Sequence, residues 1–329
     1  MEADGEEKFR AGAGREGWYT ADFAMNPALH VGVDENGLGP RLGPMIVTGA
    51  LVAVGDVEAF DAAARAAGIG DSKAVGAHGA MRHLEGTVLA LLEVHLGLRP
   101  ANFSELSAAL CMQDDAALRA LCPTGDAPRM CFGAPVPLPA FDGVVTEARR
   151  DAARALLDAG GALRAVRYFS VCNRRLHVEQ DHGRSRFDVD LARMVDLVAA
   201  LRREAGAPVR AVCGKVGGRK RYAQELERLS PLVAIEEESR RRAAYRVPSV
   251  GSVAFVQDAD ASDAAVGLAS LVGKYVRELS MLRIHRDLVG GVPDLRPASG
   301  YHDPVTTRYI QATTLVRAAR HIPDDCFER

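Results

Sequence analysis

The chain has 329 residues, a length that fits one large domain or two modest ones. Hydrophobic residues make up 48% and charged residues 26%, which is typical of a folded globular protein and excludes a disordered or fibrous one. Lys and Arg number 41 against 43 Asp and Glu, so the net charge of −2 excludes attachment to nucleic acid by bulk charge. Any polyanion would have to bind a local basic patch.

The first part of the chain alternates predicted strands and helices. Residues 1–28 are rich in Gly and charged residues, so we expect a flexible arm, and because they hold no apolar core we expect no signal peptide. From His30 the strand HVGVD, the Gly/Pro-rich turn ENGLGPRLGP and the strand MIVTGALVAV predict a hairpin. DVEAFDAAARAAG predicts a helix, and a longer helix is expected over residues 76–96, after the loop GIGDSK.

The second part of the chain continues this alternation after a break. Residues 98–160 lack a sustained period of 2 or 3.6 and predict an insertion rich in loops. Beyond it, strands are predicted at LRAVRYFSVCN and PVRAVCG. Helices are predicted at FDVDLARMVDLVAALRREAG and DAAVGLASLVGKYVRELSML. We therefore expect residues 29–329 to form one α/β domain. No apolar run approaches the roughly 18 residues of a membrane helix, so a soluble, cytoplasmic protein is expected.

The six cysteines follow no metal or disulfide spacing. The sequence contains neither CxxC nor a paired His spacing, and the chain is too long for a typical disulfide scaffold. We expect reduced, mostly buried thiols. The cysteines are Cys111, Cys122, Cys131, Cys172, Cys213 and Cys326.

Two adjacent carboxylates, Asp34 and Glu35, carry the clearest chemical signal. They end an apolar strand and precede the glycine turn of VDENGLGPRLGP. Carboxylates and water are the ligands that Mg²⁺ and Mn²⁺ prefer, so the pair indicates a site for a hard cation. An Asp–Glu pair beside glycines is also common in ordinary turns, and the pair alone does not decide between the two.

Five motifs in one order resemble those of the ribonuclease HII family. DENGLGP stands where the family has DEAGRGP, DSK (Asp71–Lys73) is retained, and a VGG–Tyr segment follows. DAD then leads a helix whose ASLVGK is similar to the family's ASILAK, with Ser270 ten residues after Asp260, and Gly300 and Tyr301 close the series. The resemblance covers roughly residues 30–95 and 165–315. It implies a ribonuclease H-like fold, a mixed sheet flanked by helices, with a C-terminal helical part.

The resemblance also implies a metal-dependent nuclease. Two divalent ions close together need several converging carboxylates to neutralise them. Asp34 would bridge both ions, Glu35 would support one and Asp260 would hold the other, with Mg²⁺ or Mn²⁺ as the cofactor. We predict these three residues as the catalytic and metal-binding set.

One catalytic aspartate of the family is missing. It should fall within AVCGKVGGRKRY, at Gly214 if VGG is aligned or at Cys213 if the bacterial VDG is aligned. Neither residue is a carboxylate, and thiolate is a poor ligand for Mg²⁺. Asp258, Asp263 or a residue of the insertion is a candidate replacement.

A second departure concerns recognition of the RNA–DNA junction. The family's GRG element, whose backbone contacts the 2′-hydroxyl, is Gly37-Leu38-Gly39 here. The backbone amides survive the change, but the guanidinium does not. Because the 2′-hydroxyl distinguishes RNA from DNA, the glycines are the part that matters. Tyr301 matches the family's junction tyrosine; packing in a half-buried position is the alternative.

Basic residues near these motifs are candidate phosphate contacts. Lys215 and Arg219 belong to a basic turn beside the predicted site, although a solvated loop is the common interpretation of such a cluster. Lys73 and Lys274 are further candidates. Residues 236–242 hold three Glu before three Arg and predict a solvated, self-paired surface.

Two functions are compatible with these motifs. The chain is either a working endonuclease that hydrolyses the RNA strand of RNA–DNA hybrids, or a degenerate relative that binds hybrid or duplex nucleic acid without cutting it. A nuclease for another phosphodiester is a weaker third possibility. The expected partner is an RNA–DNA hybrid or a duplex with an embedded ribonucleotide. No membrane and no protein partner is implied, and we expect a monomer.

Overall fold

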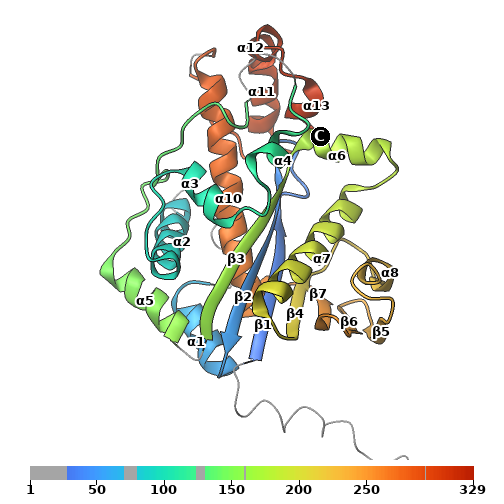
Figure 1. Cartoon of the computed structure of the whole chain (residues 1–329). Helices are drawn as coiled ribbons and strands as arrows, with labels where there is room; N and C mark the ends of the chain where they lie inside the picture. Colours follow the sequence, from blue (N-terminus) through green and yellow to red (C-terminus); the bar gives the residue numbers. More distant parts are fainter. Residues whose placement is uncertain (1–27, 70–79, 124–129, 159–160, 293) are drawn as a thin grey trace, which may run out of the picture.

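A seven-stranded sheet forms the centre of the protein in the computed structural model, which describes residues 28–69, 80–123, 130–158, 161–292 and 294–329 (Figure 1). The strand order is β3-β2-β1-β4-β7-β6-β5. β1 pairs in parallel with β4 and β4 with β7, while the other neighbours are antiparallel. The strands are β1 Ala28–Asn36, β2 Met45–Val54, β3 Gly161–Val171, β4 Val209–Gly214, β5 Ala234–Glu238, β6 Arg242–Val247 and β7 Gly251–Val256.

Helices cover both faces of this sheet, which confirms the predicted mixed sheet flanked by helices (Figure 1). One face packs against α7 (Arg186–Ala205), with α8 (Ala223–Leu226) beside it, and the core there includes Val31 and Val33 of β1. The other face packs against the long helix α10 (Ala264–Val289). The helices α1 (Val57–Ala66), α2 (Ala80–Leu96), α3 (Phe103–Leu110) and α5 (Glu147–Asp158) join α10 in that second core.

Helix α10 lies directly on the backbone of β1. A Cβ atom on Gly32 would collide with the backbone of Ala265 and Val266, at the first turns of the helix. Farther along, a Cβ on Gly273 would meet Thr48 Oγ1 at 2.6 Å and Asn36 Oδ1 at 2.7 Å. The absence of side chains at Gly32 and Gly273 therefore sets the short separation between helix and sheet.

A C-terminal helical part lies beyond the end of α10, as predicted. α11 (Pro304–Ala312), α12 (Thr314–Ala319) and α13 (Asp324–Phe327) gather around the end of α10, and α6 (Asn173–Asp181) contacts α13 (Figure 1). Proline at the start of α11 and the Asp303 side chain, which accepts from Thr306 N, begin the first of these helices. Their small core comprises Leu42, Met130, Met281, Ile284, Leu288, Tyr309 and Phe327.

Several elements match their predictions, and others do not. The hairpin β1–β2, the helices α1, α7 and α10 and the strands β3 and β4 are confirmed. Residues 98–160 hold more structure than the predicted loops: α3, α4 (Asp115–Arg119) and α5, with Asn102 and Asp114 capping the first two. β5 and β6 lie where the sequence predicted only a solvated surface. The self-pairing expected within residues 236–242 is present for Glu237 and Arg242 at 2.6 Å, whereas Glu236 meets Arg246 of β6 at 2.8 Å.

The predictions on the cysteines and on membrane-spanning helices can also be compared with the structure. All six cysteines are free, but only Cys213 is buried, so the prediction of mostly buried thiols is wrong. Among the described residues, no helix combines the length and the apolar character that crossing a bilayer requires. Residues 1–27 of the predicted arm and the DSK motif lie outside the described residues.

Candidate metal and nucleic-acid site

The predicted carboxylates lie on elements that end at one edge of the sheet. The parallel strands β1, β4 and β7 run side by side, with Val33 paired to Cys213 and Cys213 to Phe255. Asp34 and Glu35 therefore come at the carboxyl end of β1, level with the last residues of β4 and β7. The short helix α9 (Ala259–Ser262), which carries Asp260, follows β7 and contacts β4. Carboxyl ends of neighbouring parallel strands commonly form ligand sites.

Of the two positions at which the resemblance implies an aspartate, Gly214 is the one that faces Asp34. A Cβ atom built on Gly214 would lie 2.8 Å from Asp34 Oδ1, so the two positions share one face of the sheet. Cys213 points to the opposite face, where it is fully buried in the core that includes α7. Because side chains alternate along a strand, a carboxylate at position 213 would not face Asp34, whereas one at position 214 would.

Glu35 is held in a setting that favours its protonated form. Burial and then the nearby charge of Asp34 raise the pKa of Glu35 from 4.5 to about 7. The backbone N–H of Leu38 donates to the Glu35 carboxylate, and Arg329 and Arg277 oppose the rise in pKa by their positive charges. A carboxyl with a pKa near neutrality can exchange a proton for a cation at physiological pH.

Asp190 is a further carboxyl at this site that the sequence did not indicate. It belongs to α7, is 1% exposed, and its Oδ1 has no hydrogen-bond partner. Burial, followed by the charges of Glu35 and Asp34, raises the pKa of Asp190 well above its ordinary value. The available signal was a single acidic residue within the apolar stripe of α7, between Val189 and Leu191.

The residues considered as replacements for the missing aspartate differ in their surroundings. Asp263 is engaged elsewhere: its carboxylate lies 2.8 Å from His30 Nε2 and accepts from Val266 N at the start of α10. Although burial opposes the shift, the hydrogen bond to His30 and the charge of His30 lower the pKa of Asp263. Asp258 is exposed at the N-terminus of α9, in a left-handed conformation with φ 53°. Asp190, by contrast, lies close enough to Glu35 and Asp34 for their charges to raise its pKa.

The donor groups fit a hard divalent cation in kind. Asp34, Glu35 and Asp260 offer carboxylate oxygens, and the buried Oδ1 atoms of Asn36 and Asp190 have no hydrogen-bond partner. Within the part of the chain that the structure describes, no three or more His, Cys, Asp and Glu side chains are grouped so that they could hold a metal ion. The assignment of Asp34, Glu35 and Asp260 as metal ligands stays a prediction.

A cleft of about 910 Å³ lies next to Glu35 and contains most of the predicted recognition residues. Its walls include the turn Gly37-Leu38-Gly39, Lys274 of α10 and Tyr301. Tyr301 is 50% exposed, and its ring lies over the Arg277 guanidinium at 5.1 Å. The predicted junction residues and one carboxylate of the pair therefore border one cleft, where an exposed aromatic ring is available for stacking.

Two arginines that the sequence analysis did not identify contact the Gly37–Gly39 turn and the segment before Tyr301. Arg329 donates to the carbonyl oxygens of Gly37, Leu38 (3.1 Å) and Gly43 (2.8 Å). Arg277 is 2% exposed and donates to Ser299 O at 3.0 Å, next to Tyr301. A Cβ atom on Gly37, whose φ is 103°, would lie 2.8 Å from Arg277 Nε, so glycine is required there on two counts.

The other predicted phosphate contacts lie apart from this cleft. Lys215 donates to the carbonyl oxygens of Ser239 (3.1 Å) and Arg240 (2.7 Å), and Arg219 forms an ion pair with Asp188. Neither lines the cleft beside Glu35. Because their charged groups are engaged within the protein, the structure does not bring them to the predicted site. Lys73 lies outside the described residues.

Comparisons with known proteins give matches at the level of structure alone. No protein-family model and no curated protein matches the sequence. The chain is similar to ribonuclease HII of Archaeoglobus fulgidus, solved in a complex with PCNA, with TM-score 0.44 and 15% identity over 91% of this chain and 93% of that chain. It is similar to ribonuclease H2 of Pyrococcus horikoshii OT3 with TM-score 0.46 and 16% identity over 91% and 92%. Bst-RNase HIII, solved with Mn²⁺, gives TM-score 0.48 and 14% identity over 94% and 69%. At these values the similarity concerns the overall course of the chain and extends to no residue of the site.

Proposed function

We propose that the protein binds RNA–DNA hybrids, or duplexes with an embedded ribonucleotide, and hydrolyses the RNA strand with the help of Mg²⁺ or Mn²⁺. The observation that carries this proposal is the single cleft that joins Glu35, the Gly37–Gly39 turn, Lys274 and Tyr301. The motif order in the sequence agrees with it. The predicted cytoplasmic location and monomeric state stay predictions.

In this proposal the carboxylates at the adjoining strand ends and the residues that line the cleft have separate tasks. Asp34, Glu35 and Asp260 hold the divalent cation, with Asp190 available as a further oxygen ligand close to the first two. A divalent cation held by these residues would supply positive charge to activate water and stabilise the leaving oxygen. Backbone amides of the Gly37–Gly39 turn face the ribose 2′-hydroxyl, Tyr301 stacks on the sugar, and Lys274 meets a backbone phosphate.

The test is cleavage of a duplex that contains one ribonucleotide, with Mg²⁺ or Mn²⁺ supplied in turn. We expect cleavage at the ribonucleotide by the natural protein and none by Asp34→Asn or Asp260→Asn, while all three bind the duplex. An all-DNA duplex is the substrate control. Equal cleavage of both duplexes would contradict recognition of the 2′-hydroxyl.

A second candidate function is binding without cleavage. It is favoured by Gly214, which places no carboxylate beside Asp34 where the resemblance implies one. Retained binding of the duplex without cleavage under either cation would support this second function and exclude the first.

A further inference from the structure

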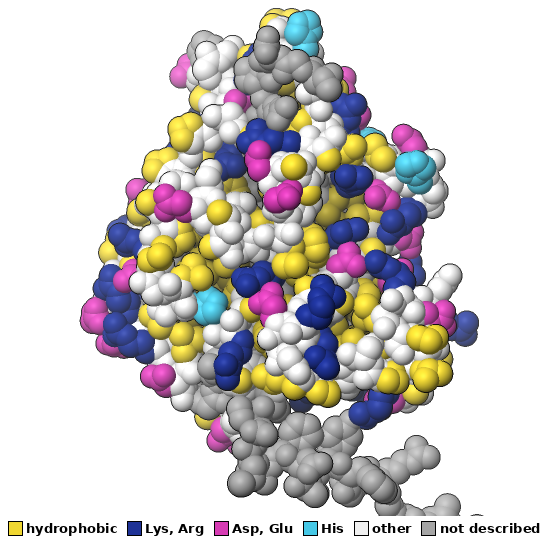
Figure 2. Space-filling model, in the orientation of Figure 1, with side chains coloured by type: hydrophobic (Ala, Val, Ile, Leu, Met, Phe, Trp, Pro, Cys, Tyr) yellow, Lys and Arg dark blue, Asp and Glu magenta, His cyan; other side chains and the backbone are white. Residues whose placement is uncertain are grey.

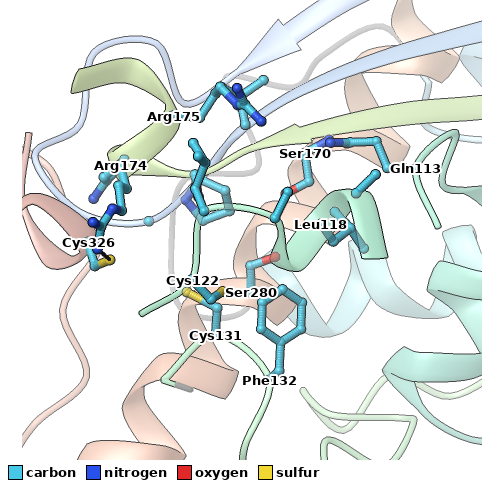
Figure 3. Close-up of a pocket in the computed structure, with 18 of the residues that line it drawn as sticks. Gln113, Leu118, Cys122, Cys131, Phe132, Ser170, Arg174, Arg175, Ser280 and Cys326 are labelled. Carbon is cyan, nitrogen blue, oxygen red and sulfur yellow. Dashed lines mark hydrogen bonds between the residues drawn. The ribbon is translucent and has the colours of Figure 1, made fainter. Parts of the chain in front are cut away.

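A second pocket, of about 480 Å³, lies on a different side of α10 and shares no lining residue with the cleft beside Glu35. It is enclosed by segments that are distant in sequence: the region of α4, the end of β3, α6, α7, α10 and α13. Figure 3 shows Arg174 beside Cys326 on one side of this pocket and Gln113 with Ser170 on the other. A volume of this size is within the range of small-molecule sites.

The lining of the pocket holds more positive than negative side chains, although Arg174 pairs with Asp325 at 3.7 Å and Arg193 with Asp196 at 3.1 Å outside the lining. Its described lining residues include the arginines Arg174, Arg175, Arg193 and Arg283. Glu179 is the one carboxylate among these lining residues, and it is paired with Arg184 at 3.0 Å. On the face shown in Figure 2, Lys and Arg side chains gather over α6 and α7 around apolar side chains.

Arg283 is the most informative member of this group. It is 7% exposed, its Nε has no hydrogen-bond partner, and its Nη2 donates to Ser104 Oγ at 3.3 Å. No carboxylate of the described residues forms an ion pair with it. Burial of a charged guanidinium without a counter-charge is costly, and an anion in the pocket would remove that cost.

Aromatic and aliphatic side chains in and beside the lining indicate the nonpolar part of a ligand that the pocket could bind. Arg283 lies 4.3 Å over the ring of Phe103, and Arg119 lies 4.4 Å over the ring of Phe132. Leu118, Leu121 and Ile284 add apolar surface. Guanidinium groups bind phosphate and carboxylate by paired hydrogen bonds, whereas the aromatic and aliphatic walls favour a flat apolar body.

We propose that this pocket binds a small organic anion that carries a phosphate or carboxylate on an apolar, flat body, with Arg283 as the buried anchor of the anionic group. Arg175 has no hydrogen bond or ion pair with any described residue and would supply a second contact. This site is independent of the cleft beside Glu35, so it stands or fails separately from nuclease activity.

The test uses the whole protein with phenyl phosphate, benzoate and the neutral control benzyl alcohol. We expect at least one of the two anions to raise the melting temperature by about 4 °C at saturation, and the neutral compound to have no effect. Comparison of the two anions identifies the preferred group. Arg283→Leu should abolish the rise, Arg175→Ala should weaken it, and Arg164→Ala, an exposed arginine outside the pocket, should leave it unchanged.

Two further measurements locate the ligand and guard against a folding defect. Bound anion should protect Cys172 and Cys326, which line the pocket, from N-ethylmaleimide, but should not protect Cys111, which is half-buried outside it. Without ligand, Arg283→Leu should melt no lower than the natural protein, because it removes an uncompensated buried charge. No rise with either anion, or an equal rise in Arg283→Leu, would overturn the proposal.

Discussion

A Cβ atom on Gly214 would stand 2.8 Å from Asp34 Oδ1, which makes these two residues neighbours on one face of the sheet. The carboxylate that the resemblance implies can therefore be placed beside Asp34 by a substitution at Gly214. We predict that Gly214→Asp raises Mn²⁺-dependent cleavage at an embedded ribonucleotide by at least about tenfold, equivalent to about 1.4 kcal/mol of barrier. Mn²⁺ is the better test ion because it binds such sites more tightly than Mg²⁺.

Cys213→Asp is the matched control for that substitution. Cys213 is fully buried on the opposite face of β4, so a carboxylate there should lower stability and leave cleavage unchanged. An equal gain from both substitutions would show that the gain does not depend on the position beside Asp34.

The raised pKa of Glu35 predicts a pH-dependent stability. A carboxyl whose pKa is higher in the folded than in the unfolded state adds stability that is fully present below the unfolded value of 4.5 and is lost as pH rises through about 7. The natural protein should therefore lose stability relative to Glu35→Gln between pH 4.5 and 7. Urea unfolding of both proteins across this range measures the difference, and parallel pH profiles would contradict it.

The hydrogen bonds of Arg329 predict that binding depends on a residue distant in sequence from the turn. Arg329→Ala removes three hydrogen bonds to the loop that contains Gly37, Leu38 and Gly43. We expect weaker binding of a hybrid duplex, by about tenfold or more, since each hydrogen bond to a charged group contributes roughly 1.5–3 kcal/mol and the effect reaches the ligand only in part. Fluorescence anisotropy at fixed salt measures it.

Arg296→Ala provides the control for the loss of a positive charge, because Arg296 is exposed and does not line the cleft. If the two substitutions weaken binding equally, the effect of Arg329 is one of net charge and not of support for the turn.

Tyr301 should affect the choice between RNA and DNA more than overall affinity. Removal of its exposed ring in Tyr301→Ala should reduce the ratio of affinities for a hybrid and an all-DNA duplex, because the proposed contact of the ring is with the sugar of the ribonucleotide. Tyr301→Phe keeps the ring and should keep the ratio. A ratio unchanged in both variants would assign Tyr301 to packing on Arg277.

The basic residues divide into two groups with different expected salt dependence. Lys274→Ala should flatten the slope of log affinity against log salt by up to about 0.9 for each phosphate that the lysine neutralises. The double change Lys215→Ala and Arg219→Ala should leave the slope unchanged, because these groups bind Ser239, Arg240 and Asp188 within the protein. The opposite result would assign phosphate binding to the basic turn instead.

Local patterns in the sequence were sufficient to predict many of the strands and helices. Apolar strands around a glycine turn predicted β1 and β2, and helical periodicity predicted α7 and α10, since both signals lie within one element. β5 escaped prediction because its side chains are mostly exposed and carry charges that suggest a surface loop or helix.

The site was predictable only where a motif was continuous. Asp34, Glu35 and the following turn are adjacent in sequence, whereas only the register of β1 with β4 shows that Gly214 lies beside Asp34. Asp190 and Arg329 act through interactions across 150 or more residues, and nothing near them in sequence indicates those interactions. The gathering of Cys122, Cys131, Cys172 and Cys326 around one pocket is equally a product of the tertiary fold.

The close approach of α10 to Gly32 affects how mutational tolerance in this protein should be interpreted. A side chain of any size at position 32 would meet the backbone of Ala265 and Val266, which cannot move aside as a flexible side chain can. In a library that samples all residues there, glycine alone should survive selection for folding, although Gly32 contributes no chemical group to the site two residues away. Intolerance at Gly32 would therefore measure the fit between helix and sheet, and only positions such as Asp34 would separate selection for activity from selection for folding.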